Sequence, residues 1–255
     1  MIAYSGTGTA IKFKRTTAVT IVVPAIRNLL IDGTGNNNPG KKGLEVVDAE
    51  EMAITDLEVI NWTDTSTRTS IGVEIAGRQT FDVSRVTSVA DIPFNIVLDP
   101  NVASITLDHA NFNDIYTIAH STQPNWKIAD GAILSNVSWG GYQAWVNGTY
   151  GIYWNSTSDA IISNSISIAN CRWEQSTNAN GYILHLRNAT GIYGLNVKNC
   201  YGGTGTAHKG YYFRSTTNGL FSGNVYGGTA EAFNVGDGTV SGVNTRLDMV
   251  GNWFN

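Results

Sequence analysis

The chain has 255 residues, a formal net charge of −4 at pH 7 and only 14% Asp, Glu, Lys and Arg, against roughly 25% in ordinary soluble domains. Its polarity comes instead from Asn, Thr, Ser and 28 glycines, a composition typical of turns and β surface rather than of amphipathic helices. The negative balance argues against nucleic acid as a partner, and no apolar run reaches the roughly 20 residues that cross a bilayer.

A repeating unit of roughly 20–30 residues runs through the chain, in which a small residue is followed by short apolar runs with alternating polar positions. The clearest unit begins at Gly43 and has runs at 44–46, 52–54 and 57–60. In chain order, units begin at Gly8, Gly43, Gly72, Pro93, Asp114, Gly151, Gly181, Gly210 and Glu231. Three short strands per unit predict a β-solenoid, because a β-propeller needs four antiparallel strands per blade. We predict one all-β domain over residues 1–255 with about nine turns.

The repeats resemble the right-handed parallel β-helix, the pectate-lyase-like fold, over essentially the whole chain. Three apolar runs end at Asn61, Asn170 and Asn199, and in that fold Asn side chains stack in a ladder at a turn. We interpret the three Asn as such a ladder. Cys171 and Cys200 follow two of them, and side chains stacked on neighbouring strands point the same way, which fits a disulfide poorly. We therefore expect two reduced, packed thiols.

Six aromatic residues collect between Trp139 and Trp154. Segment 139–150 occupies the place of the variable loops that follow the third strand in other units, and loops at one place in successive turns usually form the binding face. The alternation predicts that Trp154 packs inside. The side chains expected to stack on sugar rings are Tyr142, Trp145, Tyr150, Tyr153 and Trp62. A loop folded onto its own turn and a contact with another subunit are alternatives.

The first strands are expected to form an outward row that brings Glu45 and Glu74 roughly 5 Å apart. Two carboxylates at that distance repel, which would raise one pKa and place an acid beside a base, near the roughly 5–5.5 Å separation of retaining glycosidases. The alternative is a surface pair neutralised by Arg27, Lys41 or Arg78. The full predicted row is Glu45, Glu74, Asn95, Thr117, Tyr153, Ile183, Tyr212 and Asn234.

The stretch SITLDHANF, residues 104–112, resembles the pectate-lyase segment in which an Asp-His pair follows alternating apolar residues. The resemblance implies that Asp108 and His109 are catalytic candidates. The Arg-rich motif and calcium-binding acid cluster of those lyases have no clear counterpart, nor do the paired acids and Gly-His-Gly of polygalacturonases. No His/Cys cluster has the spacing of metal ligands, and we expect neither a metal nor another cofactor.

The regular repeats of this chain, with their Thr/Asn surfaces and few charges, resemble the shafts of bacteriophage tail spikes and tail fibres. This resemblance implies a homotrimer, in the virion or outside the cell, that binds bacterial surface polysaccharide and sometimes cuts it, without entering a membrane. Because the repeats extend over the whole sequence with no recognisable cap, we expect a segment of a longer chain or a member of an assembly. A secreted polysaccharide lyase or hydrolase and a purely structural solenoid are the alternatives.

Overall fold

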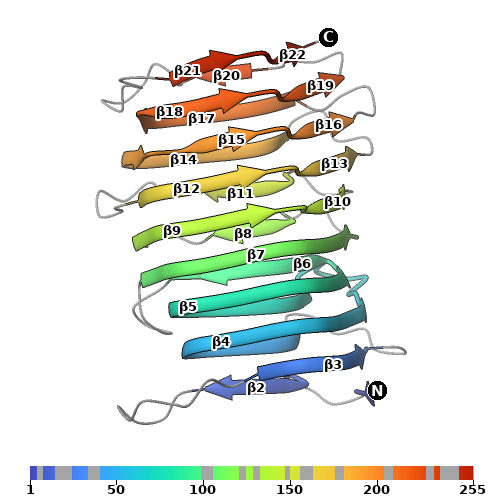
Figure 1. Cartoon of the computed structure of the whole chain (residues 1–255). Coiled ribbons are helices and arrows are strands. Elements are labelled where there is room, and N and C mark those ends of the chain that lie inside the picture. The colour runs from blue at the N-terminus through green and yellow to red at the C-terminus, as the bar shows by residue number, and fades with distance from the viewer. Residues whose placement is uncertain are drawn as a thin grey trace.

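The computed structural model describes residues 1–4, 8–14, 25–33, 41–98, 106–120, 125–128, 133–146, 150–155, 163–175, 181–203, 209–227, 233–235 and 247–254. These residues form strands and no helix, so none of them belongs to a helix that could span a membrane. The strands pair in parallel and coil into a stack of turns (Figure 1). The predicted all-β parallel solenoid is confirmed.

The stack contains 22 described strands, several of which bend around a corner and continue on the next face. Their bounds are β1 (Ile2–Ala3), β2 (Ile11–Lys14), β3 (Ala25–Asp32), β4 (Lys42–Trp62), β5 (Ile71–Ala90), β6 (Ile92–Val97), β7 (Thr106–Ala119), β8 (Trp126–Ile128), β9 (Ile133–Gly140), β10 (Gln143–Val146), β11 (Ile152–Asn155), β12 (Ser163–Ala169), β13 (Arg172–Gln175), β14 (Tyr182–Tyr193), β15 (Asn196–Lys198), β16 (Tyr201–Gly203), β17 (Lys209–Thr217), β18 (Gly219–Ser222), β19 (Val225–Gly227), β20 (Phe233–Val235), β21 (Leu247–Val250) and β22 (Trp253–Phe254).

Each turn contributes a first, a second and a third strand segment, and the paired positions form three columns with one member per turn. The first column is Ile11, Leu44, Val73, Phe94, Trp126, Ile152, Leu184, Tyr211 and Phe233. The second is Ile26, Ile54, Val83, Phe112, Trp139, Ile168, Val197, Phe221 and Met249. The third is Ile31, Val59, Ser88, Thr117, Ala144, Trp173, Gly202, Tyr226 and Phe254.

The core is a continuous apolar column inside the coil, because alternate residues of each strand point inward and parallel pairing places them in register. In the middle turns aromatic side chains fill it. The rings of Phe94 and Trp126 stack with centroids 4.3 Å apart, and Phe112 and Trp139 stack at 5.9 Å. Trp154 is also fully buried, as predicted. Much of the aromatic cluster at 139–154 therefore belongs to the core.

The small residue at the start of the best-matched units has a steric cause. A Cβ placed on Gly43 would lie 2.7 Å from the carbonyl oxygen of Gly72, and one placed on Gly72 would lie 2.8 Å from that of Pro93. Both distances are shorter than real Cβ contacts allow. The repeat therefore begins where the backbone of one turn passes closest to the backbone of the next.

Residues at the corners adopt positive φ angles, and the predicted Asn ladder forms at one of these corners. Asn170 and Asn199 have φ of 54° and 53°, and Asn199 Nδ2 donates to Asn170 Oδ1 at 3.4 Å. Asn61 does not belong to this ladder. It follows a third strand rather than a second one, and its Nδ2 donates to Asp32 Oδ1 at 2.9 Å. Strands on all three faces share the same alternation of apolar and polar residues, so this pattern could not show that Asn61 lies at a different corner from Asn170 and Asn199.

Cys171 and Cys200 lie just beyond that ladder, on adjacent turns. Both are buried and free, as predicted. A hydrogen bond with Cys200 and burial raise the pKa of the Cys171 thiol well above its usual value, so Cys171 is a protonated packing residue at neutral pH.

Candidate functional site

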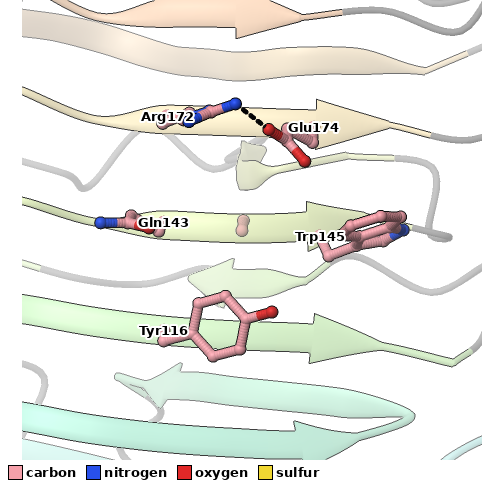
Figure 2. A pocket seen from close by; sticks show the side chains of 6 residues that line it. Tyr116, Gln143, Trp145, Arg172 and Glu174 are labelled. Atoms are coloured by element: carbon pink, nitrogen blue, oxygen red, sulfur yellow. Dashed lines mark ion pairs between the residues drawn. The ribbon is translucent and has the colours of Figure 1, made fainter.

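A shallow groove of about 150 Å³ lies on the outward side of the third strands. It is built by β7, β10 and β13, which are successive neighbours in the stack (Figure 2). Its floor is the buried Ala144, and its other lining residues are Tyr116, Gln143, Trp145, Arg172 and Glu174.

Two outward rows of side chains flank this groove. In-register pairing aligns Tyr116, Gln143, Arg172 and Tyr201 in one row, and Ile118, Trp145, Glu174 and Gly203 in the other. Positions two residues apart on one strand are separated by roughly 6.6 Å, and neighbouring strands by roughly 4.8 Å. The groove between the rows therefore runs along the solenoid axis, across the strands, with one rung of side chains per turn.

Two exposed aromatic rings, of Tyr116 and Trp145, line this groove on a rigid frame, and a third, of Tyr201, lies one strand beyond it. The exposed fraction is 39% for Tyr116, 49% for Trp145 and 42% for Tyr201. A parallel strand inside the stack is paired on both sides, so the backbone that carries Trp145 is fixed by Ile118 and Glu174. Half-exposed rings held in place can bind a ligand at little cost in side-chain entropy.

The groove carries one ion pair, between Arg172 Nη2 and Glu174 Oε1. The guanidinium of Arg172 also lies 5.8 Å from the ring centroid of Tyr201. Both charged side chains are more than one-third exposed, so the pair contributes roughly 0–1 kcal/mol to stability. Its larger effect is to leave the six described residues that line the groove with no net charge.

Of the predicted aromatic platform, only Trp145 lies at the groove. Tyr142 and Trp62 are wholly buried, so the prediction that they stack on sugar is wrong. The Tyr142 hydroxyl lies 3.0 Å from Thr117 Oγ1 and accepts a hydrogen bond from Asn125 Nδ2, while burial raises the pKa of Tyr142 well above 10. Trp62 stacks on Tyr4 with ring centroids 5.7 Å apart.

Tyr150 and Tyr153 lie on a different face, outside the first strands. Their ring centroids are 4.3 Å apart, and the Tyr153 ring stacks on His185, which in turn stacks on Tyr212. Tyr212 is buried and Tyr153 is half-buried. The platform expected from 139–154 is therefore divided between two faces of the solenoid.

The register of the first strands differs from the predicted outward row at two places and adds Lys12 at its start. Lys127 and His185 occupy the positions expected for Thr117 and Ile183, both of which are buried. The observed row is Lys12, Glu45, Glu74, Asn95, Lys127, Tyr153, His185, Tyr212 and Asn234.

Glu45 and Glu74 are nearest neighbours in this row, as predicted. Their side chains are only 5% and 4% exposed, and Lys42 Nζ donates to both carboxylates. Lys12 Nζ lies 2.7 Å from the second oxygen of Glu45, and Asn95 Nδ2 donates to that of Glu74 at 2.8 Å. All four carboxylate oxygens therefore have a partner.

The charge balance at Glu45 differs from that of a catalytic acid. Burial acts to raise its pKa, but hydrogen bonds and charge from Lys12 and Lys42 outweigh burial and hold the pKa below its ordinary value. The same contacts raise the pKa of Lys42 despite its burial. Lys12 and Lys42 neutralise the pair, and neither was among the expected cations Arg27, Lys41 and Arg78; the side chain of Arg78 lies outside the described residues. The geometry is that of a structural ion cluster.

Asp108 and His109 lie at the corner between a first and a second strand, away from the third strands that form the groove. His109 Nδ1 is 2.8 Å from Asp108 Oδ2, and Ser135 Oγ and Asn136 Nδ2 donate to Asp108 Oδ1. Partial burial raises the pKa of Asp108, but these hydrogen bonds lower it by more, so that the net shift is downward. The carboxylate is thus occupied by neighbours within the corner.

Sequence reasoning missed most of the groove, namely Tyr116, Gln143, Arg172 and Glu174, and also the neighbouring Tyr201. The usable signal was the outward set of positions in the third strands, such as Gln143 and Trp145 on either side of the inward Ala144. Among the described residues, no group of three or more His, Cys, Asp or Glu could hold a metal ion.

Comparisons with protein-family models, with curated proteins and with solved structures find no match. The class that the fold and groove define is a parallel β-solenoid with an exposed aromatic groove along its axis.

Proposed function

We propose that the chain is a right-handed β-helix module of the bacteriophage tail spike or tail fibre type that binds bacterial surface polysaccharide, in the virion or outside the cell. The supporting observation is the groove in which Tyr116 and Trp145 are exposed on the paired strands β7 and β10, with the exposed Tyr201 following on β16, one strand beyond the groove. Right-handedness is the strong preference of parallel strand crossovers. Sugar rings offer C–H faces that pack on aromatic rings, and hydroxyls that bond to groups such as Gln143.

Binding rather than cleavage is proposed, because the candidate acids are engaged elsewhere. The carboxylates of Glu45 and Glu74 are buried and fully paired, and they lie outside the first strands. A general acid must be able to reach the glycosidic oxygen of its substrate. The groove itself offers one carboxylate, that of Glu174, and it is paired with Arg172.

Trp145→Ala is expected to weaken polysaccharide binding by roughly 1–3 kcal/mol, the usual contribution of an aromatic contact residue. The ring lies outside the core, so the melting temperature should change little. Binding is measured by isothermal titration calorimetry against a panel of purified bacterial capsular and O-antigen polysaccharides.

Tyr193→Ala is the matched control, because Tyr193 is comparably exposed but lies at the end of β14, away from the third strands that form the groove. It should leave affinity unchanged. Equal losses in the two variants, or no wild-type binding to any member of the panel, would count against the proposed groove.

A homotrimer is the assembly we propose, as in the shafts that the sequence resembles. Static light scattering should then give about three times the 27.4 kDa chain mass. A monomer would contradict the proposed assembly. A trimer that Trp145→Ala converts to monomers would show that the groove is a subunit contact, which favours the purely structural alternative.

A further inference from the structure

We infer, resting on the proposed function, that Glu174 is a specificity-determining residue that makes the groove select uncharged over acidic polysaccharide. The inference comes from the pairing of charges inside the groove. Arg172 is the one cation among its described lining residues, and Glu174 is the one anion.

Arg172 is already engaged on two sides. Its Nη2 bonds to Glu174 Oε1, and its guanidinium lies over the Tyr201 ring. Figure 2 shows Arg172 and Glu174 side by side on β13, with the ion pair facing the groove. A carboxylate on a glycan would have to displace Glu174 from Arg172 in order to gain the same bond. The exchange replaces one charge-assisted hydrogen bond by another, so it brings no net gain.

The carboxylate of Glu174 also acts directly on an incoming anion. Glu174 shares its row with Trp145, one strand away. A sugar packed on the Trp145 ring would therefore lie within a few ångströms of this charge. Like charges at such a distance repel, more strongly as the ligand excludes water from the groove. An acidic sugar is thus disfavoured at the position where the ring contact is best.

An uncharged sugar meets no such conflict. It can pack on the rings of Tyr116 and Trp145, accept and donate hydrogen bonds at the Gln143 amide, and leave the Arg172–Glu174 pair intact. Its binding releases no counterions, so its affinity should be almost independent of salt. The groove therefore selects uncharged glycans in two ways. Glu174 repels acidic sugars, and the aromatic rings and the Gln143 amide bind uncharged ones.

The test variant is Glu174→Gln, which keeps the shape of the side chain and frees Arg172. The probes are acidic capsular polysaccharides and the same polysaccharides after chemical reduction of their carboxyl groups, so that each pair differs in charge alone. Wild type should bind the reduced forms more tightly than the acidic forms, with little effect of 50–300 mM salt, a range of roughly 14 to 6 Å in Debye length. Glu174→Gln should reduce or reverse this preference by roughly tenfold, the ratio given by about 1.4 kcal/mol, and its binding of acidic forms should weaken with salt.

Glu58→Gln is the matched control. Glu58 is exposed on the same outward row as Tyr116, two strands before it, and outside the groove. Glu58→Gln changes the net charge by the same amount as Glu174→Gln, so a general electrostatic attraction to acidic polysaccharide would appear in both variants. Equal shifts in the two variants would overturn the inference.

Wild-type preference for the acidic forms would also overturn the inference, while leaving the proposed glycan groove standing. Failure of wild type to bind either form of any probe would instead contradict the proposed function itself. Trp145→Ala separates the two, since it should weaken binding of whichever form is preferred.

Discussion

Replacing Ile75 by Asp is expected to lower the free energy of unfolding by about 4–5 kcal/mol or more, a large part of the roughly 5–15 kcal/mol that stabilises a folded domain. Ile75 is fully buried, and the register places it between Val46 and Ile96 of the adjoining turns. An Asp there would bring a carboxylate into an apolar column with no cation or donor to pair with it, which is among the most destabilising changes possible. Urea denaturation followed by far-UV circular dichroism measures the loss.

Val225→Asp is the matched control, because it makes a similar change of chemistry at an outward position. Val225 lies on β19, is 36% exposed and pairs with the uncharged Tyr201 and Trp253, so its replacement should change stability by no more than about 1 kcal/mol. If both variants lost the same free energy, the assignment of inward and outward positions would be wrong. A loss of less than about 1 kcal/mol in Ile75→Asp, the usual size of an ordinary substitution, would contradict the continuous core.

Alternation alone was sufficient to predict the fold and much of its core. In β4 and β5 the apolar positions recur at every second residue, and Leu44, Val46, Val73 and Ile75 are all buried as that pattern requires. The close approach at Gly43 marks where a turn starts. Both signals are local, since they depend on one strand and its neighbours. Both signals can therefore be recognised in the sequence without knowledge of the overall path of the chain.

The alternation of apolar and polar residues could not show to which of the three faces of the solenoid a strand belongs. Segment 114–119 reads like a first strand, yet Thr117 lies in the third column, and the next first strand along the chain is β8. In the later unit, Ile183 rather than Gly181 aligns with Gly151, as the hydrogen bond from the Gly151 amide to the Tyr182 carbonyl and the pairing of Ile152 with Leu184 require. All three faces bury the same kinds of side chain, so loop length decides the register.

The groove was harder to predict for the same reason. Tyr116, Trp145 and Arg172 come from three different turns and meet only through pairing in register. Trp145 was identified because it is aromatic and lies in an aromatic-rich segment. Arg172 and Tyr116 carry no such local signal, and Tyr142 carried a misleading one, since it is an equally aromatic residue that points inward.

Lys42→Met is expected to cost about 3 kcal/mol of unfolding free energy at pH 7, the lower end of the range for removing one partner of a buried ion pair. Lys42 is the shared partner of Glu45 and Glu74, which are adjacent and almost fully buried. Without it, two carboxylates would face each other across neighbouring strands. Lys12 would still compensate Glu45, which is why the lower end of the range applies.

The pH dependence separates this charge effect from a loss of packing. In the wild type the pKa of Glu45 is lowered by its lysines, so its contribution to stability is present above its ordinary pKa of about 4.5 and is lost as the pH falls through the lower folded value. In Lys42→Met the two neighbouring carboxylates repel each other, so protonation of one of them relieves the repulsion and stabilises the folded variant. The stability gap between wild type and variant should therefore narrow as the pH falls from 7 to about 4.5.

The triple variant Lys42→Met, Glu45→Gln, Glu74→Gln supplies the matched control for that narrowing. It removes both carboxylate charges while keeping their shape, so it should be more stable at pH 7 than Lys42→Met alone. Its stability gap to the wild type should not show the same narrowing in acid, since no carboxylate pair remains to be protonated. If Lys42→Met lost as much stability at pH 4.5 as at pH 7, the lysine would act by packing its aliphatic stem. If it lost none at pH 7, the ion cluster would not hold this face of the solenoid together, and Glu45 and Glu74 would again be candidates for chemistry.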